Sequence, residues 1–595
     1  MLFKAKTHSR LLLRKVLNMK LIVITGFLLA LFAVKTFAQG LDDRFKPLPL
    51  PEVEPTPIIE PPLAHPSHDD NRDAVLVNEL VSIQVLGDAS LFREQPDSSL
   101  FGVSIQSVPV DNTESLEERL RGYIGQPLTL ALLDTLNQEI VLWLRSQDMP
   151  MADAITPSGQ DITDGRLQIV VLIARRGELS VEDGQYFSGE DVRDQFRIAK
   201  GDFLNYSTLQ EELVWANRNP FRRVNLQLAP GSDTGFADLY FNIEDRFPFR
   251  FYTGIDDAGS RSTDTDRYLA GMNWGNALGM GHQLGYQYAT SASNNRLNAH
   301  SFTYIAPLSS RHTFSFYGSY VDSQPKIQEG FTIKGKTREL GFAYRIPVNN
   351  VWGWQSDIEF GYDFKRSNNN LKFGIEEVFD TTVEVSEFSI RSNMVRSDDH
   401  GRTNAFIGIY VSPGEITSGN NNQAFEAARA NSPASYEYVR LSLERLSFLP
   451  KGWVWKIEST AQWSSERLLS SQQLGVGGFN SVRGYEPFAA SGDHGIQVRN
   501  ELSTKSLQPF SSMSSWPFSP DNMQGIAFVD YGYVKTHKPL PGEVSHSELL
   551  SAGLGVRYSI GTWLSGRLDY AWPLKIAPQA TSRDPRVHFS LTLLY

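Results

Sequence analysis

The sequence predicts two small α+β units followed by a transmembrane antiparallel β-barrel of about sixteen strands. Three observations predict this fold class. From Phe247 to Tyr595, segments of about ten residues alternate apolar and polar side chains and are separated by turn clusters. Two successive patterns of helices and strands precede this half. The chain begins with a basic and then apolar segment that is typical of protein export.

Residues 1–38 are predicted to be a signal peptide. A long basic segment precedes the apolar run from Leu21 to Val34, and Thr36-Phe37-Ala38 fits a cleavage site. The alternative is a transmembrane anchor, but the apolar run is short for a span. Because no later run reaches that length, membrane embedding has to come from strands.

Composition limits the possible chemistry. The net charge of −11 argues against nucleic acid as a partner. The chain has no cysteine, which excludes disulfides, Cys-ligated zinc, iron–sulfur clusters and thiol nucleophiles. We find no metal-ligand cluster, phosphate-binding loop or nucleophile elbow in a fitting context. We therefore expect no enzymatic activity, no cofactor and no metal.

Residues 39–73 are rich in proline, which favours extended polyproline conformation. Residues 74–175 then predict a first α+β unit, with Ser90 to Val110 as an insertion. Its expected elements are a strand from Ala74 to Leu86, a helix from Leu116 to Arg121 capped by Thr113, a helix over 128–143 and a strand from Arg166 to Ala174.

Residues 176–246 repeat this pattern as a second unit. Ser188 and Ser207 are expected to cap two helices, and Pro220 follows the second of them. The predicted elements are a strand over 178–181, helices over 190–196 and 209–217, and strands over 222–228 and 237–244. Any small α+β fold would fit each unit alone.

Residues 247–595 predict the barrel, with two soluble β-sandwiches as the alternative. Two long polar stretches, Ser367 to Thr382 and Pro413 to Pro433, are expected to be loops. Long loops that alternate with tight turns are typical of outer-membrane barrels. The last strand, Val587 to Tyr595, places Phe589, Leu591, Leu593 and Tyr595 on one apolar face.

One glycine-rich segment, residues 475–495, interrupts the strands and carries Val482-Arg483-Gly484-Tyr485. Its glycines predict a shaped loop. A surface loop with a solvated arginine is the simple alternative. A loop folded into a barrel would instead place Arg483 near lumen carboxylates.

Strand alternation indicates which carboxylates face the lumen. If Ala527, Val529 and Tyr531 face lipid, then Phe528, Asp530 and Gly532 face inward. The same reasoning places Glu501 inward. A guanidinium has five donors in a planar fork and suits two carboxylates, so Asp530 and Glu501 are the candidate partners of Arg483. A lone carboxylate solvated by channel water is the alternative.

These motifs together resemble the two-partner secretion transporters, which export hemolysins and adhesins and belong to an outer-membrane superfamily of POTRA domains and barrels. The resemblance rests on Val482–Tyr485, Phe528–Gly532, Ser491-Gly492-Asp493 and Asn500-Glu501-Leu502. It implies that both α+β units are POTRA domains, that Asp530 meets Arg483, and that the terminal aromatic strand is a targeting signal.

The resemblance implies an outer-membrane transporter with periplasmic POTRA domains that take up an unfolded exoprotein. The implied partners are this exoprotein, outer-membrane lipid and the barrel assembly machinery, and we expect a monomer. Many relatives carry a plug helix, for which the prolines of residues 39–73 leave little room. An assembly factor for other barrels and a passive solute channel remain the alternatives.

Overall fold

The computed structural model describes residues 46–48 and 73–595, except for 111, 234, 327–330, 374–375, 512–517 and 579. The chain forms two compact units, one of residues 53–247 and one of residues 1–52 with 248–595. The expected signal peptide, residues 1–38, and most of the segment 39–73 lie outside the described residues. Among the helices of the described part, none combines the length and apolar character needed to cross a membrane.

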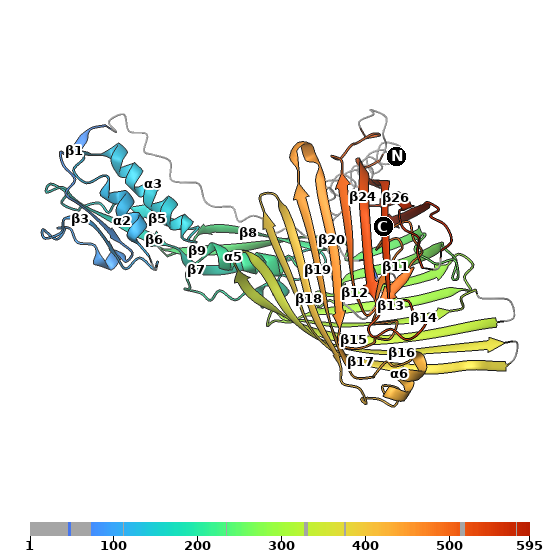
Figure 1. Cartoon of the computed structure of the whole chain (residues 1–595). Coiled ribbons are helices and arrows are strands. Elements are labelled where there is room, and N and C mark those ends of the chain that lie inside the picture. The colour runs from blue at the N-terminus through green and yellow to red at the C-terminus, as the bar shows by residue number, and fades with distance from the viewer. Residues whose placement is uncertain are drawn as a thin grey trace, which may run out of the picture. The chain divides into compact units, whose positions relative to one another are not determined.

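The first α+β body contains two helices packed on a four-stranded sheet of order β3-β2-β6-β5 (Figure 1). Its apolar core includes Leu116 and Leu120 from one helix and Leu136 and Ile140 from the other. The elements are β1 Val75–Val77, β2 Ser82–Leu86, a 3-10 turn Ala89–Leu91, β3 Gly102–Gln106, α2 Glu114–Arg121, β4 Leu128–Thr129, α3 Leu130–Ser146, β5 Ala152–Ile155 and β6 Arg166–Ile173.

Three details of this body differ from the sequence prediction. The expected strand from Ala74 to Leu86 is divided into β1 and β2. Thr113 stands at the N-cap but makes no capping hydrogen bond; instead, Oδ1 of Asn112 accepts from the N–H of Glu114 at 2.9 Å. The helix expected from residue 128 begins at Leu130, where Thr129 caps it through the N–H of Leu132.

The insertion between residues 90 and 110 supplies strand β3, which pairs in parallel with β2. Gln168 on β6 holds the insertion, since its amide accepts from the N–H of Arg93 and donates to the Arg93 carbonyl at 2.8 Å. The insertion therefore adds an edge strand to the sheet beside β2.

The second α+β body has a three-stranded sheet of order β7-β9-β8. Ser188 accepts from the N–H of Glu190, as predicted, but the helix there ends at Arg193. Ser207 does not cap; it lies inside the next helix, and its N–H donates to Asp148 at 2.7 Å. The elements are β7 Arg175–Glu182, α4 Glu190–Arg193, α5 Tyr206–Ala216, β8 Arg222–Pro230 and β9 Phe236–Asp245.

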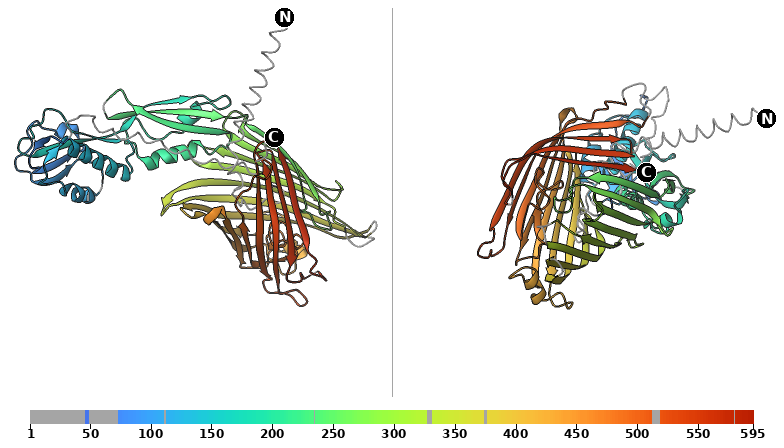
Figure 2. Two further views of the ribbon diagram at one scale, coloured as in Figure 1. Left: turned by 90° about the horizontal axis from the view of Figure 1, so that it is seen from above. Right: turned by 90° about the vertical axis from the view of Figure 1, so that its right-hand side faces the viewer.

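The compact unit that contains residues 248–595 is a closed antiparallel barrel of sixteen strands, which confirms the predicted strand number (Figures 1 and 2). The last strand closes the barrel by pairing with the first. The strands are β10 Phe249–Asp256, β11 Arg267–Ala277, β12 His282–Ser291, β13 Leu297–Pro307, β14 Thr313–Ser323, β15 Phe331–Val351, β16 Trp354–Phe373, β17 Glu376–Asp398, β18 Gly401–Ser412, β19 Tyr436–Phe448, β20 Val454–Ser464, β23 His494–Ser503, β24 Asp521–Lys535, β25 His546–Ile560, β26 Leu564–Pro573 and β27 Arg586–Leu594.

Side chains alternate between the two faces of the barrel wall. On β24, Ala527 and Val529 are exposed on the outside, whereas Phe528 and Asp530 are buried on the inside. The outer face carries large apolar side chains such as Phe360, Leu340 and Leu554. This pattern is the one that a hydrocarbon environment requires of a barrel.

Residues 367–382 were expected to form a loop, but residues 367–373 and 376–382 are strand. They belong to the long hairpin of β16 and β17, which continues beyond the pairing of β17 with β18 at Phe388↔Val411 (Figure 1). On the other side, β15 pairs with β16 as far as Phe331↔Phe373. Ladder hydrogen bonds do not require alternating side chains, so these polar segments remain strands. The stretch 413–433 is a loop as predicted, and it carries α6 Asn422–Ala428.

Candidate functional site: a loop against the inner barrel wall

The glycine-rich segment 475–495 forms a loop that lies against the inner wall. Two short strands, β21 Leu474–Val476 and β22 Ala490–Gly492, pair at its base. Gly477 has a φ of 107°, and a Cβ there would lie 2.5 Å from the carbonyl oxygen of Glu486, so only glycine fits. At the tip of the loop, Val482 and Arg483 have no exposed surface.

Arg483 makes a bidentate ion pair with Asp530 on β24. Its Nε and Nη2 atoms donate to the two carboxylate oxygens at 2.6 and 2.7 Å, and its backbone N–H donates at 3.2 Å. Nη1 donates to Glu501 on β23 at 2.5 Å. The guanidinium also lies over the ring of Phe528, 3.5 Å from its centroid.

A third carboxylate, Asp569 on β26, completes this charge cluster. It lies 3.5 Å from Nη1 of Arg483 and accepts from Arg557 at 2.5 Å and from Arg567 at 2.7 Å. Arg499 donates to Glu501 at 3.0 Å. Because each buried charge has an opposite partner, the cluster holds the loop without leaving an isolated charge in a low-dielectric interior.

Neighbouring residues of the loop bind two further parts of the wall. The N–H of Gly484 donates to Nε2 of His588 on β27 at 2.9 Å. The hydroxyl of Tyr485 contacts the carbonyl oxygens of Leu550 and Lys575 at 2.7 and 2.8 Å. The four residues Val482 to Tyr485 thus contact β24, β25 and β27 as well as the chain that follows β26.

The base of the loop is tied to the neighbouring loops at one rim of the barrel. Asp493 accepts from Arg429 at 2.6 and 3.1 Å and from the N–H of His537 at 2.8 Å. Arg467 pairs with Glu543 at 2.7 Å. The hydrogen bond from Arg467 lowers the pKa of Glu543 to about 2, and a second hydrogen bond from the N–H of Leu540 acts in the same direction.

The structure brings together the residues that the sequence analysis singled out in the loop and on β23 and β24. Arg483 meets both Asp530 and Glu501, and Gly532 faces Val482, where a Cβ would lie 2.9 Å from Cγ2. The C-terminal residues lie elsewhere. Leu591 and Leu593 face outward, Phe589 is half-buried, and 93% of the Tyr595 surface is exposed.

Sequence reasoning missed Asp569, Arg557, Arg567 and His588. A signal for them exists on β26, where Arg567 and Asp569 alternate with the outward residues Leu568 and Tyr570. The same alternation on β27 places His588 inward. The positions could therefore have been found, whereas their proximity to Arg483 depends on how the barrel closes.

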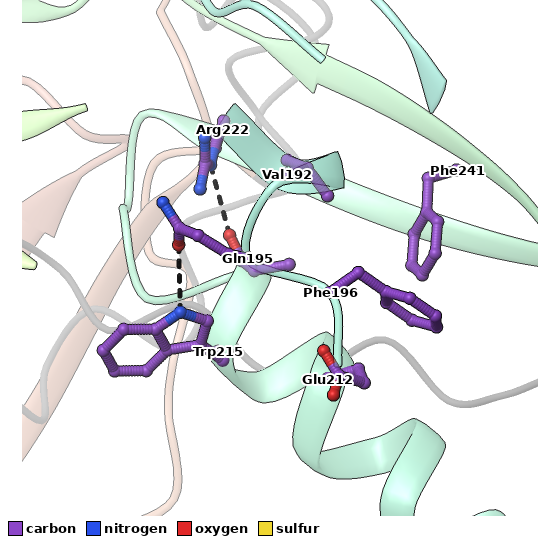
Figure 3. A pocket seen from close by; sticks show the side chains of 8 residues that line it. Val192, Gln195, Phe196, Glu212, Trp215, Arg222 and Phe241 are labelled. Atoms are coloured by element: carbon purple, nitrogen blue, oxygen red, sulfur yellow. Dashed lines mark hydrogen bonds between the residues drawn. The ribbon is translucent and has the colours of Figure 1, made fainter. Parts of the chain in front are cut away.

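A small cavity in the second α+β body is a poor candidate for a ligand site (Figure 3). Its volume is about 10 Å³, room for one water molecule. Two of its polar side chains already have partners: Trp215 Nε1 donates to Gln195 at 2.9 Å, and Arg222 Nε donates to the Ala216 carbonyl at 3.1 Å. In the described part of the chain, no three His, Cys, Asp or Glu residues are grouped as a metal site.

Comparison with known proteins identifies related chains. The model of the haemolysin secretion/activation protein family ShlB/FhaC/HecB matches residues 235–558. The heme/hemopexin transporter protein HuxB of Haemophilus influenzae strain 86-028NP is 25% identical over 489 residues, which cover 78% of this chain and 81% of HuxB. The outer membrane transporter CdiB of Dickeya dadantii strain 3937 is 21% identical over 483 residues, 76% of this chain and 78% of that protein.

The fold is also similar to that of a solved transporter. CdiB from Escherichia coli superposes with a TM-score of 0.68 at 17% identity, covering 90% of this chain and 94% of that one. At this identity the similarity concerns the fold, and it extends over both the barrel and the α+β bodies.

Proposed function

This chain belongs to the haemolysin secretion/activation protein family ShlB/FhaC/HecB, and from this premise we propose that it secretes an unfolded partner exoprotein across the bacterial outer membrane. Relatives are named as transporters in the outer membrane or for heme and hemopexin. The observation that carries the proposal is the loop held inside a closed barrel by Arg483, Asp530 and Glu501.

The two α+β bodies, residues 74–175 and 176–246, are proposed to be periplasmic POTRA domains. The order of strand, two helices and two strands in each supports this assignment. Strand addition to a free sheet edge would bind an unfolded chain through backbone hydrogen bonds. Edge strand β8 is longer than β5, which favours the second domain as the main docking edge.

The inward loop is proposed to be a positioned part of the export path. This proposal is supported by the contacts of Arg483, Gly484 and Tyr485, which fix the loop at a defined place on the inner wall. Residues Phe589, Leu591, Leu593 and Tyr595 are proposed to direct the chain to the barrel assembly machinery and then to contact outer-membrane lipid. We further propose that the protein acts as a monomer without catalysis and that residues 1–38 are removed after export.

The test is secretion of a co-expressed exoprotein, for which a long, repetitive secreted protein encoded by a neighbouring gene would be the first candidate. A variant lacking residues 53–246 should form a heat-modifiable barrel in outer membranes but release no exoprotein into the medium. Full secretion by this variant would remove the role proposed for the α+β bodies.

A further inference from the structure

A short piece of the proline-rich segment lies against the inner wall of the barrel. The N–H of Leu48 donates to the hydroxyl of Tyr252 on β10 at 3.0 Å. The carbonyl oxygen of Leu48 accepts from Arg250 on β10 and from Asn273 on β11, each at 3.2 Å. Both main-chain polar groups of one residue are therefore bound by side chains of the wall.

We call the preorganised site formed by these wall residues the amide cradle. It consists of Arg250, Tyr252, Asn273 and, on β12, Gln287. Arg250 donates to Asn273 Oδ1 at 2.6 Å, and Tyr252 donates to Gln287 at 3.0 Å. Tyr252, Asn273 and Gln287 are each at most 4% exposed. The neighbouring inward position is Gly285, where a Cβ would lie 3.1 Å from Pro47, so the wall leaves room for a passing chain.

The cradle recognises the chemistry of the peptide unit. It offers an acceptor to an amide N–H and two donors to a carbonyl, whereas a neighbouring strand would offer one acceptor and one donor. Every residue except proline presents the same two groups. The ligand class of the cradle is therefore the main chain of an extended polypeptide, with little dependence on side chains.

We propose that the amide cradle binds the main chain of the exported polypeptide and that Leu48 occupies it in the resting protein. This inference rests on the proposed secretion function. Three hydrogen bonds hold one residue, so an entering chain with many peptide units at high local concentration can replace it. The exchange leaves no buried donor or acceptor of the wall unpaired.

Planar bilayers that contain the full-length protein provide the test, with a synthetic peptide as probe. The probe is a 20-residue peptide of glycine, serine, asparagine and threonine, and its current block is measured against concentration. A peptide of the same sequence with N-methylated amides has no N–H to donate. We expect it to block at least fivefold more weakly than the unmodified peptide.

Variants separate the cradle from its resident segment. Leu48→Pro removes the donated N–H and should increase the apparent affinity of the unmodified peptide severalfold, whereas Leu48→Ala should match the wild type. Arg250→Ala and Asn273→Ala should weaken the block. Asn404→Ala, on the inner face of β18 where the amide donates to Glu444, is the matched control. Heat-modifiable migration verifies that each barrel is folded.

Equal block by both peptides, or an unchanged affinity in Leu48→Pro, would overturn the proposal. The outcome is independent of the secretion assay, because the bilayer contains no exoprotein. If the cradle variants lose peptide block while the wild type fails to secrete, the cradle stands as a binding site for main-chain amides, and the proposed function with its exported ligand falls. If secretion proceeds and the cradle variants block normally, only the cradle falls.

Discussion

His588 on the last strand and Asp257 after the first strand are joined by a 2.8 Å hydrogen bond, although 331 positions separate them in the sequence. The ladder between β10 and β27 runs from Tyr252↔Leu594 to Asp256↔Ser590. Because the backbone N–H of Gly484 donates to Nε2 of the same imidazole, Nδ1 carries the hydrogen and donates to Asp257. One side chain thus connects the inward loop to the seam of the barrel.

Replacing His588 should weaken the seam and the loop together. His588→Leu leaves the Gly484 N–H and the Asp257 carboxylate without this partner, a loss of roughly 1–3 kcal/mol for each buried group. We expect the heat-modifiable form to convert at a temperature lower by about 2–8 °C. Because the loop is then held less firmly, we also expect more frequent steps in the single-channel current when this variant is measured in planar bilayers.

His588→Gln is the matched variant, because an amide can accept from Gly484 and donate to Asp257. It should recover part of both effects. If the Leu and Gln variants behave alike, the imidazole acts only by filling space. Its two hydrogen bonds then contribute nothing to the stability of the loop or the seam.

Arg483 should be coupled to Asp530 more strongly than to any side chain outside the charge cluster. Arg483→Ala should leave an inserted barrel with poor secretion and altered conductance, since strand pairing does not depend on this contact. Asp530→Ala should reproduce the effect, and the double variant should be little worse than either, with a coupling of about 1–3 kcal/mol. Single-channel conductance and exoprotein release measure all three.

Arg483→Lys should restore only part of the function, because an ammonium cannot present a planar fork to Asp530 and Glu501 together. Arg440→Ala is a suitable control, since that inner-wall arginine on β19 donates to Gln462 and lies outside the cluster. Simple addition of the two single defects would mean that Arg483 and Asp530 are not energetic partners.

Tyr595 should contribute in two separable ways. Its backbone N–H and carbonyl pair with Phe251 at 2.7 and 3.1 Å, whereas its side chain is almost fully exposed. Tyr595→Phe should therefore be nearly neutral, Tyr595→Lys should reduce the amount of inserted barrel, and deletion of residue 595 should reduce it further. Outer-membrane levels after quantitative blotting rank the three, and equal levels would contradict both contributions.

The contact between Arg467 and Glu543 should depend on acidity only below pH 4.5. Hydrogen bonding by Arg467 lowers the pKa of Glu543 from 4.5 in an unpaired carboxyl to about 2. A lowered pKa means that the contact stabilises the loops fully above pH 4.5 and loses its effect as the pH falls through 2. Nitroxides on Ala427→Cys and Val544→Cys should therefore move apart between pH 5 and pH 2.

The same labels on a Glu543→Gln background provide the control. The loops should already be farther apart at pH 5, and acid should change the distance little. A distance that stays constant in the native pair down to pH 2 would show that this contact does not hold the loops.

The barrel could be predicted from sequence wherever one face of a strand meets lipid. Alternation placed Phe528, Asp530 and Glu501 inward, and the structure has them there. The hairpin at residues 367–382 escaped prediction because its polar residues carry no alternation, although the ladder of β16 with β17 continues through them. Periodicity reports the environment of a strand, and a strand outside the membrane has water on both sides.

The contacts of the site were only partly accessible from sequence. The pair of Arg483 with Asp530 could be expected from sequence, because both residues belong to motifs that resemble those of one family. Asp569 and His588 reach the loop from strands whose positions follow only from closure of the barrel. The contact of Leu48 with the wall left no sequence signal, because it involves main-chain atoms of a proline-rich segment.

The protruding part of β17 would be an adhesive edge if the loop with α6 did not cover it. Near Glu384, the loop supplies the carbonyl of Gly419, which accepts the Glu384 N–H at 2.9 Å, and the amide of Asn420, which donates to the Glu384 carbonyl at 3.2 Å. Phe425 then packs over Val383 and Val385. Uncovered strand edges recruit the edges of other molecules. Shortening this loop is therefore expected to expose the edge of β17 and to favour its pairing with strand edges of other molecules.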